Sequence, residues 1–272
     1  MVLAGGRSSR MGTPKAALEW HGSTLLRRTL GVLARVVDGP LLVVRAPGQE
    51  LPPLPAGVEV VEDPTEGLGP LQGIAAGLAA LTGRAELAYL SSTDLPFLHP
   101  AFVRRVLAAA VPDVDVALPQ ARGYPQPLAA AYRVALAPLT AELVAAGDLR
   151  PAFLFRRCAT LRLDDAALLA DPALAAADPE LDSLLNINEP DEYAGARARP
   201  APEIVVERDG ALAGNGHRPV RAATLVGAAS AAGLQLDRHV VAALNGDQIS
   251  RDGEVPLVAG DTVAFLSADA GG

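Results

Sequence analysis

Apolar positions along residues 1–195 fall into two repeating patterns that predict strands and helices in turn. Short apolar runs predict strands at 2–4, 41–44, 58–61, 87–90 and 114–118. Between these runs, apolar residues recur at helical spacing over 25–37, 70–81 and 100–110. This succession predicts an α/β fold, a Rossmann-like, doubly wound and mostly parallel sheet with helices on both faces.

The pattern changes in the last third of the chain. Residues 164–184 are rich in Asp, Ala and Pro and predict no clear element, and 186–190 form a short extended piece before a last helical turn. The segment 196–202 has Pro but no apolar period, which is typical of a linker. A strand at 204–207 and a Gly-rich hairpin region at 208–218 then precede a helix at 223–232, and strands at 240–244 and 262–266 follow it. We therefore expect a domain at 1–195, a linker at 196–202, and a small α+β domain of the β-grasp, ubiquitin-like type at 203–272.

Composition narrows the classes of protein that fit this pattern. Half of the residues are hydrophobic, which is enough for a sizeable core, and the net charge is −8. That negative charge argues against a nucleic-acid partner, because neutralising phosphates requires clustered Lys and Arg. No apolar run approaches the roughly 18 residues of a membrane span. The N-terminus has Arg where a signal peptide has an apolar region, so we expect a cytoplasmic protein.

Cysteine and histidine exclude two further classes of site. Cys158 is the one cysteine, which excludes a disulfide framework and a cysteine-based zinc site. The four histidines lack the spacing of metal ligands. Any metal bound by the chain is therefore expected to use oxygen ligands.

Lysine is almost absent from the chain. Of 23 basic residues only Lys15 is a lysine, and Ala, Gly, Pro and Arg are abundant, as in proteins from GC-rich genomes. Such a bias replaces Lys by Arg wherever Arg will serve. Because a compact ammonium fits beside a phosphate where a planar guanidinium does not, the retained Lys15 indicates a phosphate contact.

The loop that contains Lys15 has the composition of a phosphate-binding loop. Gly5 and Gly6 are adjacent and let the backbone approach a flat base or a phosphate, and Arg10 and Lys15 add positive charge. The loop matches neither a Walker loop nor the G-x-G-x-x-G pattern. It follows a strand, as does the polar loop at 91–96, and ligands of parallel sheets bind beyond the carboxyl ends of strands.

The run LAGGRSSRMGTPK at 3–15 resembles the signature of MobA-type nucleotidyltransferases, which make the guanine dinucleotide form of the molybdenum cofactor. Further matching segments follow in order over about 1–195, at 62–63, 69–73, 93–97, 124–127 and 186–188. The resemblance implies a Mg²⁺-dependent transfer of GMP from GTP to molybdopterin, with release of pyrophosphate.

The resemblance also implies roles for individual residues. Nucleotide contacts fall on Leu3, Ala4, Gly5, Gly6, Lys15, Asp63 and Asp94. The catalytic set is Lys15, Arg10 and Asp94, with Lys15 and Arg10 on the phosphates. Asp94 is implied to hold Mg²⁺ together with Asn188, and Asn186 lies behind Asn188.

The sequence departs from the family pattern at three places. Pro14 stands where relatives often have Asp, and Arg45 stands where they have a nucleotide-contacting Asn. Relatives also carry several residues before the first apolar run, whereas this chain begins inside it at Met1. The start codon is therefore misassigned or the edge of the fold is trimmed. Tyr124 and Gln126 lie in a loop that has room for a second substrate, although a plain surface loop is the favoured interpretation.

The chemistry that these residues imply needs no general base. The attacking group would be the terminal phosphate of molybdopterin, whose second pKa of about 6 leaves it largely dianionic at neutral pH. Mg²⁺ prefers oxygen ligands, typically one or two carboxylates and the substrate phosphates, and Asp94 at a strand end meets that need. Positioning and charge neutralisation then account for catalysis.

The C-terminal part resembles the MoaD/ThiS sulfur carriers. The residues that carry this resemblance are Asn245–Gly246, the segment 260–265, and the terminal Gly271–Gly272. Two residues without Cβ atoms can enter a narrow channel and present a carboxylate. The resemblance implies that an E1-like adenylyltransferase activates Gly272 and that its thiocarboxylate supplies sulfur to molybdopterin, through the large subunit of molybdopterin synthase, or to thiazole.

Two classes of alternative stay open on the sequence. The same enzyme class includes a cytidylyltransferase for the same cofactor and a sugar-phosphate nucleotidyltransferase. Gly5–Gly6 favours guanine, because cytidylyl relatives usually have Ala-Gly there. The other class is a sulfur-carrier or scaffold protein whose N-terminal domain binds nucleotide without catalysis.

Overall fold

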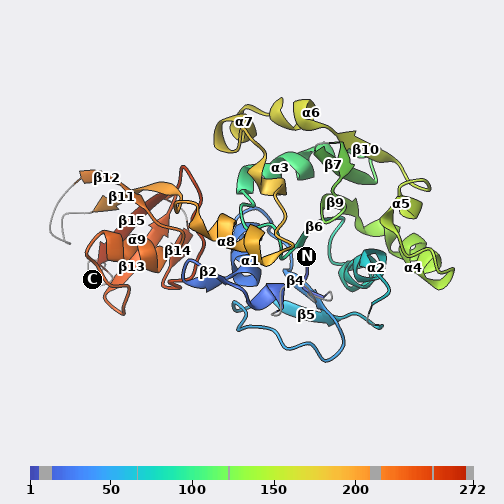
Figure 1. The fold of residues 1–272 in the computed structure, drawn as a ribbon, viewed down its shortest axis with the longest axis horizontal. Coiled ribbons are helices and arrows are strands. Elements are labelled where there is room, and N and C mark those ends of the chain that lie inside the picture. Colours follow the sequence, from blue (N-terminus) through green and yellow to red (C-terminus); the bar gives the residue numbers. More distant parts are fainter. Residues whose placement is uncertain (6–13, 66, 122, 209–215, 247, 268–272) are drawn as a thin grey trace. The chain divides into compact units, whose positions relative to one another are not determined.

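The computed structural model describes the chain except for residues 6–13, 66, 122, 209–215, 247 and 268–272 (Figure 1). Contacts divide the chain into two compact units. The first comprises Met1–Leu18 and Leu25–Pro190, and the second comprises Glu19–Thr24 and Asp191–Gly272.

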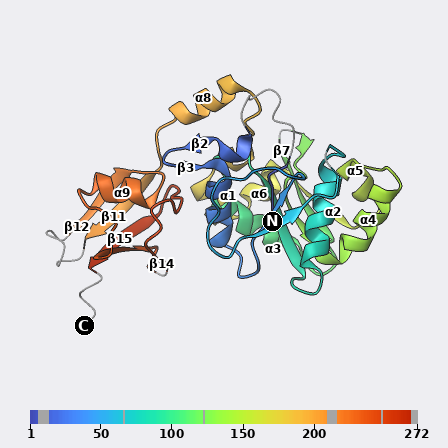
Figure 2. The ribbon, with the colours of Figure 1, turned by 90° about the horizontal axis from the view of Figure 1, so that it is seen from below.

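An eight-stranded sheet forms the centre of the first unit (Figures 1 and 2). Its strands are β1 (Val2–Leu3), β4 (Leu42–Arg45), β5 (Glu59–Glu62), β6 (Leu87–Ser92), β7 (Val116–Ala121), β8 (Tyr124–Pro125), β9 (Ala129–Arg133) and β10 (Thr160–Leu163). The order is β10-β7-β9-β6-β1-β4-β5, with β8 paired to β7. Four neighbouring strands run parallel, namely β6, β1, β4 and β5. β10 is parallel to β7. β9 lies between β6 and β7 and is antiparallel to both. The predicted mostly parallel α/β sheet is therefore confirmed.

Helices cover both faces of this sheet. α2 (Pro70–Leu81) and α4 (Ala137–Ala145) pack together on one face, and α1 (Leu25–Ala34) and α3 (Pro100–Ala109) pack on the other (Figure 2). The three helices predicted from apolar spacing are confirmed. α2 begins where expected, because Gly69 adopts a positive φ of 87° and Pro70 occupies the first turn.

Residues 164–184 contain short helices that the apolar pattern did not reveal. α6 (Asp165–Leu169) and α7 (Pro172–Ala177) are each capped by an aspartate that precedes them. The Asp164 carboxylate accepts a hydrogen bond from Ala167 N, and that of Asp171 accepts one from Leu174 N. Such capping residues mark helix starts better than hydrophobic spacing does in so short an element. α5 (Pro151–Leu154) and the 3₁₀ turns η1 (Lys15–Ala17), η2 (Val134–Leu136) and η3 (Asp182–Leu184) complete the unit.

Two expected boundaries were wrong. β7 begins at Val116 and continues to Ala121, later than the predicted 114–118. α8 (Pro190–Ala198) extends into the segment expected to be a linker, so that residues 196–198 are helical. Acidic residues in its first turn and Arg197 in its last turn suit the helix dipole, which explains the longer helix.

The second unit contains a five-stranded mixed sheet with one helix on it (Figure 1). Its strands are β11 (Glu203–Arg208), β12 (Gly216–Arg221), β13 (Val240–Leu244), β14 (Gln248–Ser250) and β15 (Thr262–Ser267), in the order β12-β11-β15-β13-β14. α9 (Leu225–Ala231) packs on the sheet through Leu225, beside the buried Phe265. The three strands and the helix predicted here are confirmed, β12 begins in the predicted hairpin region and runs beyond it, and β14 was not foreseen. A short hairpin, β2 (Glu19–Trp20) and β3 (Ser23–Thr24), belongs to the same unit.

Candidate functional site

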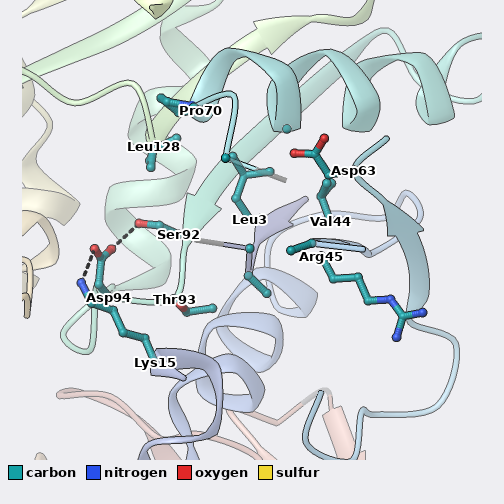
Figure 3. A pocket seen from close by; sticks show the side chains of 16 residues that line it. Leu3, Lys15, Val44, Arg45, Asp63, Pro70, Ser92, Thr93, Asp94 and Leu128 are labelled. Carbon is teal, nitrogen blue, oxygen red and sulfur yellow. Dashed lines mark hydrogen bonds and ion pairs between the residues drawn. The ribbon is translucent and has the colours of Figure 1, made fainter. Parts of the chain in front are cut away.

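A cavity of about 480 Å³ lies at the carboxyl ends of β1, β4, β5 and β6 (Figure 3). Leu3, Ala4 and Gly5 line it from the end of β1, and Asp63 lines it from the loop after β5. Its volume lies within the range typical of small-molecule sites. The position agrees with the rule that ligands of parallel sheets bind beyond the carboxyl ends of the strands.

Four polar side chains converge at one end of this cavity. The Lys15 ammonium donates to Asp94 Oδ2 at 3.3 Å and to Asn188 Oδ1 at 2.9 Å. Ser92 Oγ donates to the other oxygen of Asp94, and Figure 3 shows Ser92, Asp94 and Lys15 turned toward one another. The side chains of Lys15 and Asp94 are 18% and 19% exposed. A ligand that enters the cavity can therefore reach both.

Backbone contacts bring these distant residues together. Asp94 lies two residues beyond the end of β6 at Ser92, and Lys15 begins η1. Ile187 N donates to the Asp94 carbonyl at 2.9 Å, which holds Asn188 beside the loop after β6. Residues separated by 173 positions thus meet at one end of the cavity.

The donor set at this cluster suits a hard cation. The Lys15 ammonium stands between a carboxylate oxygen and an amide oxygen, so a positive charge already fits that position. Among the residues that the structure describes, no cluster of three or more His, Cys, Asp or Glu side chains is suited to hold a metal. Asp94 and Asn188 could supply two oxygen ligands to a divalent cation, whose other ligands would be substrate phosphates and water.

The opposite end of the cavity has little room for side chains. A Cβ atom on Gly5 would lie 3.0 Å from the Ala46 amide nitrogen, so the ends of β1 and β4 approach closely only with glycine there. Asp63 projects from the next loop, and its Oδ1 accepts hydrogen bonds from Gln72 Nε2 and from Thr65 N. A carboxylate held in this way offers an acceptor to a base or a ribose.

Arg45 occupies the position where the family pattern has Asn, and its side chain points away from the cavity (Figure 3). Its guanidinium donates to the Gln49 carbonyl at 2.9 Å and pairs with Glu62 at 2.9 Å. The departure at this position therefore adds no guanidinium to the cavity.

The structure brings together the described residues that the sequence singled out. Leu3, Ala4, Gly5, Lys15, Asp63 and Asp94 all line the cavity, and Asn188 contacts Lys15. Asn186 is exposed. Gly6, Arg10, Gly271 and Gly272 lie outside the described residues. Their roles, and those of the lining residues, stay predictions.

Sequence reasoning missed several lining positions, including Gly67 and Leu128. It placed Ser92 and Thr93 in the polar loop at 91–96 but gave neither residue a role. The signal for both is that a run of polar residues begins where the apolar part of a central strand ends, next to Asp94. Leu128 carries none, because an apolar residue in a loop is indistinguishable from a core residue.

Comparison with known proteins identifies the family of this site. The model of the MobA-like NTP transferase domain matches residues 1–162, which is more than half of the chain. The chain belongs to the family of MobA-like NTP transferases. It is a nucleotidyltransferase, and the residues that line the cavity all fall within the matched range.

Curated relatives and solved structures agree with this assignment. A probable molybdenum cofactor guanylyltransferase of Mycobacterium tuberculosis H37Rv is 39% identical over 167 residues, which are 60% of this chain and 81% of the relative. One from Mycobacterium ulcerans is 38% identical over 182 residues, or 65% and 89%. The crystal structure of molybdopterin-guanine dinucleotide biosynthesis protein A from Archaeoglobus fulgidus shares the fold, with a TM-score of 0.55 and 22% identity over 72% of this chain and 95% of that one.

Proposed function

We propose that the first unit transfers GMP from GTP to molybdopterin, forming the guanine dinucleotide cofactor and pyrophosphate. The observation that carries the proposal is the Lys15–Asp94–Asn188 cluster at one end of a nucleotide-sized cavity. The names of the mycobacterial relatives supply the acceptor substrate.

The reaction forms one P–O bond and breaks another. An oxygen of the terminal phosphate of molybdopterin attacks the α-phosphorus of GTP, and the bond from that phosphorus to the oxygen bridging to the β-phosphate breaks. The attacking phosphate is already mostly dianionic at neutral pH, so no side chain has to remove a proton. The protein's task is to position two anions and to neutralise charge as pyrophosphate leaves.

Lys15 is the described residue best placed for that neutralisation. Its ammonium is 3.3 Å from Asp94 Oδ2 and has a flexible stem, so it can exchange these oxygens for phosphate oxygens. Asp94 and Asn188 would hold a divalent cation, which when bound neutralises charge on the phosphates. Ser92, through its hydrogen bond to Asp94, orients that carboxylate.

Thermal unfolding in the presence of Mg²⁺ tests the nucleotide part of the proposal. We expect GTP to stabilise the protein more than CTP, ATP or UTP, because a ligand stabilises by RT ln(1 + [L]/Kd). Lys15→Ala should lose most of that shift. Arg84→Ala is the control cation, since Arg84 pairs with Glu59 at the opposite end of β5.

The outcomes separate the alternatives. A shift with CTP in place of GTP would contradict the guanylyl assignment and support a cytidylyltransferase. A GTP shift unaffected by Lys15→Ala would contradict the phosphate role of Lys15. No shift with any nucleotide would overturn the proposed guanylyl transfer and favour a carrier or scaffold role.

For the second unit we propose a β-grasp sulfur-carrier function. The sheet order β12-β11-β15-β13-β14, with β11 and β15 parallel at the centre and α9 packed on it, supports a β-grasp fold. The terminal Gly271–Gly272 of the sequence supports the carrier function. Its expected partners are an E1-like adenylyltransferase and the large subunit of molybdopterin synthase.

Intact-mass measurement tests the carrier proposal. Protein purified from a cell that makes molybdopterin should contain a fraction in which sulfur replaces one oxygen of the terminal carboxylate. Deleting Gly271–Gly272 should abolish that fraction and leave nucleotide binding unchanged. If the protein is never thiocarboxylated in the presence of an active E1-like adenylyltransferase, the carrier function is contradicted.

A further inference from the structure

Two glutamine side chains hold the loops that surround the base end of the cavity, although neither is among the residues that line it. Gln49 lies in the turn after β4, and Gln72 lies in the first turn of α2. The loops they join carry Ala4, Ala46 and Asp63, which do line the cavity.

Gln49 links the ends of β1 and β4. Its Nε2 donates to the Ala4 carbonyl at 3.0 Å, and its Oε1 accepts from the Ala46 amide at 3.0 Å. One partner is an acceptor and the other a donor, so the amide orientation is fixed and only an amide side chain satisfies both. The Gly5 position, where a Cβ would come within 3.0 Å of Ala46 N, depends on the same separation of the two strand ends.

Gln72 links α2 to the loop after β5. Its Nε2 donates to Asp63 Oδ1 and, at 2.7 Å, to the Thr65 carbonyl. Gln72 is 3% exposed, so these hydrogen bonds form away from water and losing them leaves buried polar groups unpaired. The two acceptors use both hydrogens of its amide group.

The Gln72 contacts leave one oxygen of Asp63 for the cavity. Thr65 N and Gln72 Nε2 both bond Oδ1, and no hydrogen bond from a described residue reaches Oδ2. Asp63 N donates to the Arg45 carbonyl at 2.8 Å, which fixes the backbone of Asp63 to the end of β4. Asp63 is thus held at its backbone and at one carboxylate oxygen, with the other oxygen available as an acceptor for N–H donors of a base.

We infer that Gln49 and Gln72 are positioning residues that set the shape of the base-binding end and so its selectivity among nucleotides. The inference rests on the proposed nucleotide-binding function. A site that recognises a base through hydrogen-bond acceptors can discriminate between bases only if those acceptors are held in fixed positions. Both glutamines act through Ala4, Ala46 and Asp63 and do not touch the reacting phosphates.

Titration calorimetry with GTP and with CTP, at constant Mg²⁺, tests the inference. Gln72→Met keeps the length of the side chain and removes both hydrogen bonds. We expect it to weaken GTP binding about tenfold and CTP binding much less, because losing hydrogen bonds to a recognition group costs about one order of magnitude. In transfer assays KM for GTP should rise while kcat stays within about twofold, since the chemistry occurs at the Lys15 end of the cavity.

The glutamate variants separate positioning from general packing. Gln72→Glu replaces a double donor by an acceptor facing Asp63, so it should bind GTP less well than Gln72→Met. Gln49→Glu also turns an oxygen toward an acceptor, the Ala4 carbonyl, but it keeps the hydrogen bond that it accepts from Ala46 N, so it should lose less GTP affinity than Gln72→Glu. This difference between the two positions follows from hydrogen-bond direction and would not arise from loss of volume.

Gln120→Met is the matched control. Its amide donates to the Gly123 carbonyl in the turn between β7 and β8, and it does not line the cavity. Its GTP and CTP affinities should equal those of the wild type. Wild-type selectivity in Gln49→Met and Gln72→Met, or an equal loss for both nucleotides, would overturn the inference. A wild-type protein that binds neither nucleotide would instead overturn the proposed function.

Discussion

At the scale of single residues, the proposed transfer reaction depends on the ammonium of Lys15. The sequence retains one lysine among 23 basic residues, and the structure places it between Asp94 and Asn188 at one end of the cavity. A guanidinium is planar and longer, so it cannot occupy the same position between these two oxygens.

Substituting Lys15 should therefore lower turnover even when charge is kept. We expect Lys15→Ala to reduce the rate of pyrophosphate release by about 10²-fold or more, as for loss of a group that stabilises developing charge. Lys15→Arg should lose at least about tenfold. Arg84→Lys is the control, because it makes the opposite substitution in the ion pair with Glu59, away from the cavity. It should leave the rate of pyrophosphate release unchanged. A Lys15→Arg enzyme with the wild-type rate would contradict this account.

Gly5 is needed for space and not for an unusual backbone angle. The missing Cβ would lie 3.0 Å from Ala46 N, and a backbone atom cannot move aside as a flexible side chain can. Gly5→Ala should therefore lower both GTP affinity and thermal stability. Gly39→Ala, where a Cβ meets nothing within 4 Å, is the control and should change neither. Equal GTP affinities of the two variants in the same titration would show that the close approach of β1 and β4 at Gly5 does not affect nucleotide binding.

At the scale of elements, the segment before Asn188 has its own anchor. Asp178 is 7% exposed, and its carboxylate accepts from Asp182 N at 2.7 Å and from Ser183 N at 3.0 Å. The Ser183 hydroxyl in turn accepts from His99 N at 3.1 Å, ahead of α3. These contacts set the path of the chain into Ile187 and Asn188.

Asp178→Ala should therefore affect both stability and catalysis. Losing a buried carboxylate leaves the two backbone N–H groups that it accepts from unpaired, which costs about 1–3 kcal/mol of unfolding free energy. Displacement of Asn188 should also lower kcat and weaken the response to Mg²⁺ concentration. Asp164→Ala removes the cap of α6, away from Asn188, and should cost stability without changing kcat. Urea unfolding and Mg²⁺ titrations of the rate check both variants, and unchanged kcat in Asp178→Ala would contradict the positioning role.

The elements also show what the sequence could predict. β4, α2 and β13 are apolar throughout or on one face, and the pattern located them to within a residue or two. β9, whose Ala-rich sequence has weak strand propensity, is held by pairing with β6 and β7 on either side, which no local pattern reports. The contact of Asn188 with Lys15 depends on the Ile187–Asp94 hydrogen bond, and spacing along the chain does not reveal such a contact. The family resemblance, not the physics of the segment, drew attention to Asn188.

At the scale of the whole molecule, the sheet of the first unit encloses the chain's own amine. The Met1 ammonium donates to the Tyr89 carbonyl at 2.7 Å, and burial lowers the pKa of this amine from 8.0 to about 5. Among the described residues, no helix has both the length and the apolar character needed to cross a membrane.

Stability of the 272-residue chain should consequently depend on pH between about 5 and 8. In that window the unfolded chain binds a proton at Met1 that the folded chain does not, so unfolding free energy rises with pH, by a few kcal/mol in all. The gain is complete above pH 8 and is lost as pH falls through the folded pKa. Acetylating the amine removes the titration, so urea unfolding of acetylated protein should show a smaller slope. Identical slopes would contradict burial of the Met1 amine.

The proposed reaction of the whole molecule is the transfer of a guanylyl group onto a pterin phosphate. The most direct measurement incubates the protein with molybdopterin, Mg²⁺ and GTP labelled at the α-phosphate, and separates the products. The account predicts label in a dinucleotide, equimolar pyrophosphate, and neither product with Asp94→Ala. Label transferred from CTP in place of GTP, or GTP bound without any transfer to the pterin, would contradict it.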